Sequence, residues 1–113
     1  MKSLAGIGLL LLLSGCSTPT IYYWGHYEPM LYASFTTPGK MPPEREVELM
    51  EQDLQKALSA NKPMPPGWHA QLGYCYLQLG KGDQAKKEFE TEKANFPESK
   101  VMMDRLINNL QKP

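Results

Sequence analysis

The stretch that decides the fold is PGWHAQLGYCYLQLGKGDQAKKEFETEKANFPES, residues 66–99. In its first half, apolar residues recur three and four positions apart, which is the spacing of one face of an α-helix. This pattern predicts a helix over residues 66–79. The inward face of that helix would carry Leu72, Cys75, Tyr76 and Leu79.

A turn and a second helix are predicted to follow. Gly80 stands where a glycine commonly ends a helix, and residues 80–82 are the expected turn. Asp83 is a suitable N-terminal cap for a helix over residues 83–95. The whole stretch is therefore predicted to form two antiparallel helices. The second of them would pack through Ala85 and Phe89.

Together, these two helices resemble one tetratricopeptide repeat, a motif of about 34 residues. The resemblance rests on a Leu-Gly pair, an aromatic one turn later, a turn glycine, a small residue at the helix crossing, an aromatic after it and a closing proline. In this chain these positions are Leu72, Gly73, Tyr76, Gly80, Ala85, Phe89 and Pro97. The small residues would let the two helices approach closely, and the aromatic rings would fill the space beside them.

Three positions depart from the motif. Trp68 is one position early for the motif's tryptophan, Gly82 stands where an aromatic is usual, and Glu92 replaces an alanine. The repeat is single and degenerate, and a lone repeat cannot bury its own faces. Flanking helices are therefore expected to cover it. Repeats of this type generally bind proteins or peptides, although a fold alone does not establish a function.

The flanking sequence supplies two such helices. A pair of prolines followed by Glu44 is typical of a helix start, and the proline-rich residues 61–67 would end this helix. Its inward face would carry Val47, Met50, Leu54, Ala57 and Leu58. Ser99 is a suitable cap for a last helix, with Met103, Leu106, Ile107 and Leu110 inward. Residues 44–113 are therefore predicted to form an all-α, tetratricopeptide-like domain of about four helices.

The first residues have the pattern of an export signal. Lys2 supplies a positive charge, and residues 4–13 form an apolar run that is too short to span a bilayer. Residues 13–16, Leu-Ser-Gly-Cys, resemble the bacterial lipobox. The resemblance implies that residues 1–15 are a cleaved signal peptide. It also implies a diacylglycerol on the sulfur of Cys16 and a fatty acid such as palmitate on its new amine.

A lipid on Cys16 would hold the chain at a membrane, because two or three acyl chains give stable attachment. Ser17 follows this cysteine. In Gram-negative lipoproteins an aspartate at that position resembles an inner-membrane retention signal, whereas serine usually permits transfer to the outer membrane. We therefore expect a lipid-anchored chain on the periplasmic face of the outer membrane.

Residues 16–43 are predicted to be irregular and rich in proline and aromatic residues. Within them, residues 21–35 (IYYWGHYEPMLYASF) hold six of the eleven aromatic residues of the chain, which is unlike a flexible tether. Three interpretations are open: the rings complete the core, they bind a partner, or they lie among lipid headgroups. The candidate partner contacts are Tyr22, Tyr23, Trp24, Tyr27 and Tyr32. A further candidate, on the concave side of the repeat, comprises Trp68, His69 and Gln71.

The order of these features resembles a group of small bacterial lipoproteins of unknown function. The resemblance covers nearly the whole mature chain and rests on the lipobox, a Tyr-Tyr-Trp-Gly-x-Tyr-Glu segment beginning at Tyr22, the Leu31-Tyr32 pair and the short tetratricopeptide-like domain. In that group the gene commonly lies beside one for a lipoprotein similar to the curli secretion channel. The resemblance implies an envelope protein partner and assigns no chemistry.

Charge and motif content count against several functions. Twelve Lys and Arg residues balance twelve Asp and Glu residues, so no basic surplus points to nucleic acid. His26 and His69 stand far apart, and no catalytic or metal-binding motif is present. The acidic residues within 88–92 alternate with lysines nearby, which predicts a solvated mixed surface. We therefore expect no enzyme, no metal and no cofactor beyond the covalent lipid.

Cys75 is the only other cysteine. With Cys16 acylated, it is either a small buried hydrophobe or a partner for a cysteine of another chain.

The function that we expect for the protein is an interaction or assembly module of the cell envelope. A structural lipoprotein that binds peptidoglycan is the alternative, and an unrecognised enzyme is disfavoured by the missing catalytic motif.

Overall fold

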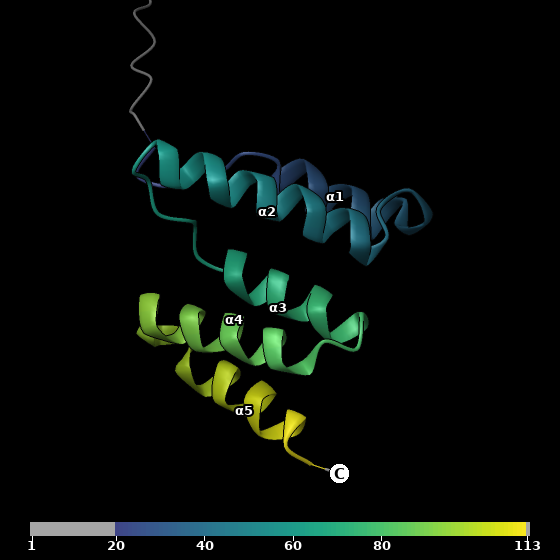
Figure 1. Ribbon diagram of the computed structural model, residues 1–113, viewed down its shortest axis with the longest axis vertical. Coiled ribbons are helices and arrows are strands. Elements are labelled where there is room, and N and C mark those ends of the chain that lie inside the picture. Colours follow the sequence, from purple (N-terminus) through teal and green to yellow (C-terminus); the bar gives the residue numbers. More distant parts are fainter. Residues whose placement is uncertain (1–19, 113) are drawn as a thin grey trace, which may run out of the picture.

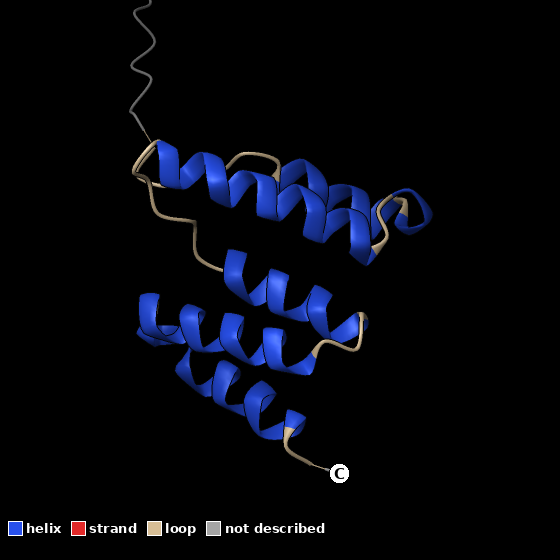
Figure 2. Ribbon diagram, viewed as in Figure 1, coloured by secondary structure: helices blue, strands red, loops and turns tan. Residues whose placement is uncertain are grey.

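The computed structural model describes residues 20–112, and every regular element in that range is a helix (Figure 2). The α-helices are α1 (Tyr27–Thr36), α2 (Pro43–Ser59), α3 (Trp68–Gln78), α4 (Gly82–Asn95) and α5 (Lys100–Leu110). Short 3₁₀ turns at Pro38–Lys40 and Pro97–Ser99 precede α2 and α5. The all-α fold is thus confirmed, and α2 to α5 form the four predicted helices. The expected signal peptide and Cys16 lie outside the described residues.

The helices stack in the order of the chain, as Figure 1 shows. Helix α3 packs against α4 as a hairpin, α2 lies against α3, and α5 lies against α4. Helix α1 joins the core through Met30 and is seen behind α2 in this view. The central hairpin is therefore covered on both sides, as a single degenerate repeat requires.

Close packing at the crossing of α3 and α4 holds the hairpin together. A Cβ atom on Gly73 would lie 2.5 Å from the ring of Phe89, so any larger residue at position 73 would push the helices apart. Phe89 and Ala85 are fully buried at this crossing, and Trp68 and Leu72 are buried beside them. The small residues that the repeat motif places here thus permit the approach of the two backbones.

Two helices end on residues in the left-handed conformation. Gly80 has a φ of +72° and ends α3, as predicted. Asn61 has a φ of +53° at the end of α2, and the Lys62 N–H donates back to the Ala57 carbonyl at 3.0 Å. Such bonds satisfy carbonyls that the last helical turn would leave without a partner.

The predicted N-terminal caps differ in detail. The prediction for Asp83 was wrong, because α4 begins at Gly82 with Lys81 in the cap position and without a side-chain cap. Ser99 does stand at the start of α5, but its hydroxyl donates to the Phe96 carbonyl at 2.7 Å. Both helix starts are therefore held by the tight preceding turns rather than by a capping side chain.

Helix α1 lies in the segment that the sequence predicts to be irregular, and that part of the prediction was wrong. Pro29 sits in the first turn of α1, where proline costs no helical hydrogen bond. Met30 is the only buried residue of this helix. With one buried position, α1 has no apolar periodicity that would reveal it in the sequence.

The inward face of α2 is more polar than predicted. Val47, Met50 and Ala57 are buried, whereas Leu58 is 66% exposed, so its inward assignment was wrong. Leu58 lies about 100° further around the helix than Ala57, which turns it away from α3. Polar Glu46 and Asp53 are buried on this helix instead. None of the helices within residues 20–112 has both the length and the apolar character needed to cross a membrane.

Candidate functional site

Part of the aromatic segment folds back onto the helices. The Tyr23 N–H donates to the Pro63 carbonyl at 2.9 Å, and the rings of Tyr23 and Tyr27 pack against the core. Burial, with a smaller contribution from the nearby Glu92 carboxylate, raises the pKa of Tyr27. Of the three interpretations of this segment, the structure therefore supports core completion for these two rings.

A polar clamp fixes the segment to α2. The His26 backbone N–H donates to Asp53 Oδ2 at 2.6 Å, and His26 Nδ1 lies 2.9 Å from Asp53 Oδ1. Gly25 sits directly over this carboxylate with a φ of +44°, and a Cβ atom there would collide with it. Asp53 is itself almost fully buried, so His26 provides the hydrogen bonds that a buried carboxylate needs, and Gly25 leaves room for it.

The remaining candidate aromatics are more exposed. Tyr22 is half-buried, and its ring lies edge-on to Phe96 at a centroid distance of 6.1 Å. Trp24 is 37% exposed and contacts the rings of Tyr22 and Tyr27. Tyr32 is exposed on α1. Of the five candidates in this segment, Trp24 and Tyr32 thus present the most surface to a partner.

Trp68 does not lie on the surface. It is fully buried and stacks edge-on against His69, whose Nδ1 lies 2.7 Å from Glu88 Oε2. The assignment of Trp68 as a partner contact is therefore corrected, because its ring is part of the core. His69 is buried with it, which agrees with packing at the helix start.

An apolar groove does lie between α1, α3 and α5. Its volume is about 430 Å³. None of its lining side chains carries a formal charge, and Phe35 and Met102 are 82% and 63% exposed. The lining residues are Phe35, Gly67, Ala70, Gln71, Tyr74, Met102 and Leu106.

Of the predicted site residues, only Gln71 lines this groove. Phe35, Tyr74 and Met102 were not predicted as site residues. A signal existed in a second stripe on α3, where Ala70 and Tyr74 share a face opposite to the buried Leu72. This stripe becomes the wall of a groove only when α1 and α5 are placed beside it.

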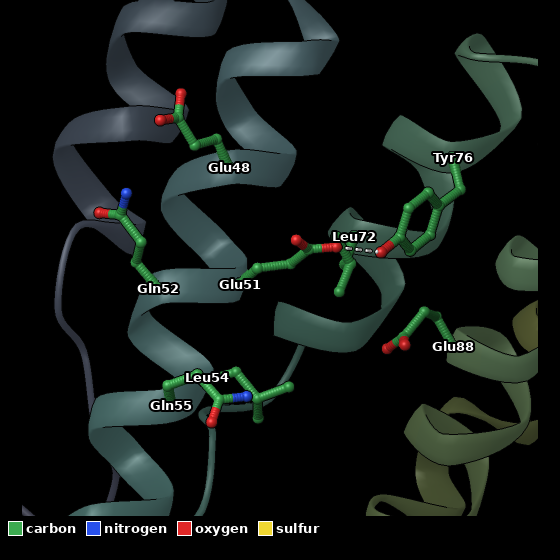
Figure 3. Close-up of a pocket in the computed structure, with 8 residues that line it drawn as sticks. All are labelled: Glu48, Glu51, Gln52, Leu54, Gln55, Leu72, Tyr76 and Glu88. Atoms are coloured by element: carbon green, nitrogen blue, oxygen red, sulfur yellow. Dashed lines mark hydrogen bonds between the residues drawn. The ribbon is translucent and has the colours of Figure 1, made fainter.

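A second hollow, of about 490 Å³, lies on the other side of α3, between α2 and α4 (Figure 3). Its lining includes carboxylates from Glu48, Glu51 and Glu88. The Tyr76 hydroxyl donates to Glu51 Oε1 at 2.7 Å, and burial, followed by this bond, raises the pKa of Tyr76. Glu88 already faces His69. Glu48 Oε2 accepts a hydrogen bond from Arg45 at 2.6 Å, so all three carboxylates are engaged within the protein.

Cys75 carries a buried thiol, which confirms the prediction that it is a small buried hydrophobe. It donates to Glu46 Oε2 at 3.1 Å, and Gln71 donates to the same oxygen at 2.9 Å. Burial, and then the adjacent Glu46 carboxylate, raise the pKa of Cys75 far above its ordinary value. The thiol is thus protonated and shielded at neutral pH, which suits packing and not nucleophilic attack.

The solvated surface predicted for residues 88–92 was wrong at Glu92. It is 2% exposed, and its Oε1 accepts a hydrogen bond from the Gly67 N–H at 2.7 Å. The carboxylate stands where the repeat motif has alanine, and it ties α4 to the start of α3. Within the described residues no group of His, Cys, Asp and Glu side chains is arranged to hold a metal ion.

Comparison with known proteins gives a family. The family described as a domain of unknown function (DUF4810) matches residues 21–106. The chain belongs to this family. The matched range begins with the aromatic segment and extends into α5, so the segment and the helices are one family unit. No curated protein and no solved structure matches the chain.

Proposed function

We propose that this chain is a lipid-anchored protein of the outer membrane whose helical repeat binds an apolar segment of another envelope protein. The anchor is Cys16, and the binding site is the groove between α1, α3 and α5. The observation that carries the proposal is the groove itself, in which exposed Phe35, Tyr74 and Met102 surround a hollow without formal charge. Large apolar side chains left open to water are typical of interaction sites.

The composition of the groove defines the partner's chemistry. A charged side chain placed there would lose water without gaining an opposite charge, since no lining residue could pair with it. Aromatic and aliphatic side chains would gain by burial, as in grooves that accept one face of a helix. Gln71 could orient the partner through its side-chain oxygen. The Gln71 Nε2 already donates to Glu46, whereas the oxygen accepts no hydrogen bond from the described residues.

The proposed anchor supports an envelope location for this partner. The pattern of residues 1–16 implies export and lipidation, so the folded domain would meet proteins of the periplasm and the outer membrane. The resemblance of the aromatic segment to small lipoproteins makes a lipoprotein similar to the curli secretion channel the first partner to test.

Neighbouring residues of α5 allow a matched experiment. Met102 lines the groove, whereas Val101 does not and is 73% exposed. Met102→Asp is expected to lower partner recovery in a crosslinked pulldown from membranes by at least about tenfold, since it buries a charge in an apolar site. Val101→Asp should leave recovery near that of the wild type, because it adds the same charge outside the groove.

The outcomes separate the alternatives. Loss of an identified envelope protein with Met102→Asp alone supports the groove. Equal recovery with both variants would contradict it. Sedimentation of the protein with purified cell wall, undiminished by either substitution, would favour the alternative function of peptidoglycan binding.

A further inference from the structure

A second exposed apolar surface lies where the described chain begins. Ile21 is 75% exposed, Leu58 is 66% exposed, and Trp24, which precedes the polar clamp in the chain, is 37% exposed. The hydrogen bond from Tyr23 to Pro63 brings the start of the chain to the loop after α2. In Figure 1 the chain also enters the fold beside this end of α2. We name Ile21, Trp24, Leu58 and Lys62 the anchor-side surface.

The anchor-side surface is hollowed and basic. Leu58 and Lys62 line a shallow hollow of about 330 Å³ together with Ala57, Asn61 and Pro63. Residues 54–67 contain two lysines and no acidic residue, and residues 20–27 contain no acidic residue either. Apolar side chains beside lysines, without acids, are the composition of surfaces that lie on anionic membranes.

The length of the chain before this surface limits where it can lie. Cys16 precedes Thr20 by four residues, and four extended residues span at most about 14 Å. A lipid on Cys16 would therefore hold the start of the anchor-side surface within about two headgroup layers of the hydrocarbon core, because headgroup regions add roughly 5–8 Å to each side of that core. A surface of open isoleucine, leucine and tryptophan so close to lipid would be driven into the interface.

We propose that the anchor-side surface rests on the bilayer, with Ile21, Trp24 and Leu58 among the headgroups and Lys62 on an anionic lipid phosphate. This inference rests on the proposed lipid anchor at Cys16. The bilayer contact and the groove use different residues, since none of the four lines the groove. The membrane contact would fix the orientation of the domain while the groove stays free for a protein partner.

The two tryptophans make the contact measurable. Trp24 lies in the anchor-side surface, whereas Trp68 is fully buried and serves as an internal reference. The full-length protein, isolated from membranes, is placed in vesicles of phosphatidylethanolamine and phosphatidylglycerol in which phosphatidylglycerol carries bromine near the top of its acyl chains. Bromine quenches only indoles that it can contact. We expect the wild type to lose most of its Trp24 emission and Trp24→Phe to show almost no quenching.

A charge variant tests the surface around Trp24 without changing the tryptophan. Leu58→Glu should lower the quenching at least twofold, because it places an anion among anionic headgroups. Val101→Glu, at an exposed position of α5, should leave the quenching as in the wild type. The intact mass of the same sample reports the lipid on Cys16.

Lipidated protein that shows no quenching, or quenching that ignores Leu58→Glu, would overturn the bilayer contact and leave the anchor standing. A mass without lipid would overturn the anchor and this inference with it. Neither result bears on the groove, which the pulldown tests separately.

Discussion

The α3–α4 hairpin and the N-terminal segment before α2 are held in place differently. The hairpin is closed by apolar packing, in which Phe89 lies directly over Gly73 and both are buried. The N-terminal segment has fewer buried apolar side chains and relies in addition on the hydrogen bonds of His26 to the buried Asp53. Only Met30 of α1 is fully buried.

The difference teaches where the stability of this small protein lies and which part can respond to a partner. Apolar packing spreads over many contacts and resists local opening, whereas a segment with few buried side chains can detach while the rest stays folded. Phe35 of the groove is on the weakly packed α1, and Tyr74 is on the strongly packed α3. The groove therefore joins a rigid wall to an adaptable one.

The largest effect is expected from the same substitution made in the two regions. Phe89→Ala should lower the free energy of unfolding by about 3–5 kcal/mol, because it leaves a cavity in a fully packed crossing. Phe35→Ala should change it by less than about 0.5 kcal/mol, since that ring is largely exposed. Urea unfolding followed by circular dichroism measures both, and similar losses for the two variants would contradict the comparison.

A smaller effect is expected at the polar clamp. Asp53→Ala should cost about 1–3 kcal/mol, because it removes the acceptor for the His26 N–H in a buried place. Hydrogen exchange should then speed up at residues 23–36 while the amides of α3 and α4 keep their protection.

Two glycines give a matched control for the clamp. Gly25→Ala would press a methyl group into the Asp53 carboxylate and should loosen the same residues, whereas Gly39→Ala meets no atom within 4 Å. Uniform faster exchange across all helices, or equal effects of Gly25→Ala and Gly39→Ala, would show that the segment and the hairpin open together.

The smallest effect is expected from the buried thiol, at alkaline pH. The pKa of Cys75 is raised in the fold, so above the ordinary value of 9.0 the unfolded chain loses this proton while the folded chain keeps it. Stability should therefore fall as pH rises above about 9, by up to about 1.4 kcal/mol per pH unit for this group. The pKa of Tyr76 is also raised in the fold, so this residue should add to the loss of stability above its ordinary pKa of 10.0.

Cys75→Ser isolates the contribution of the thiol. Serine keeps a donor for Glu46 and does not ionise in this range, so the decline should begin near pH 10 and not near pH 9. Thermal unfolding measured between pH 7 and 11 checks this. An unchanged onset in Cys75→Ser would mean that the thiol is not buried as described.

The same contrast explains what could be predicted from the sequence. Leu72, Ala85 and Phe89 follow helical periodicity and a repeat motif, so the hairpin and its neighbours could be placed. The clamp between Gly25 and Asp53 joins residues that are far apart in the chain and belong to no apolar pattern. Helix α1 was missed for the same reason.

The candidate site was harder to predict because it is made by three helices at once. Phe35, Tyr74 and Met102 come from α1, α3 and α5, and each alone is an ordinary exposed apolar residue. Trp68 stood out as a large ring beside the repeat, yet it is fully buried in the core. Residue type pointed to aromatics, but only the packing decides which of them face water.

The most direct test of the groove is site-specific photo-crosslinking in intact cells. A photoreactive amino acid at position 35 lies in the groove, and one at position 52 lies in the second hollow, on the other side of α3. The account predicts one envelope protein crosslinked strongly from position 35 and not from position 52, with the product lost in Met102→Asp. Equal crosslinking from both positions, or a product from position 52 alone, would contradict it.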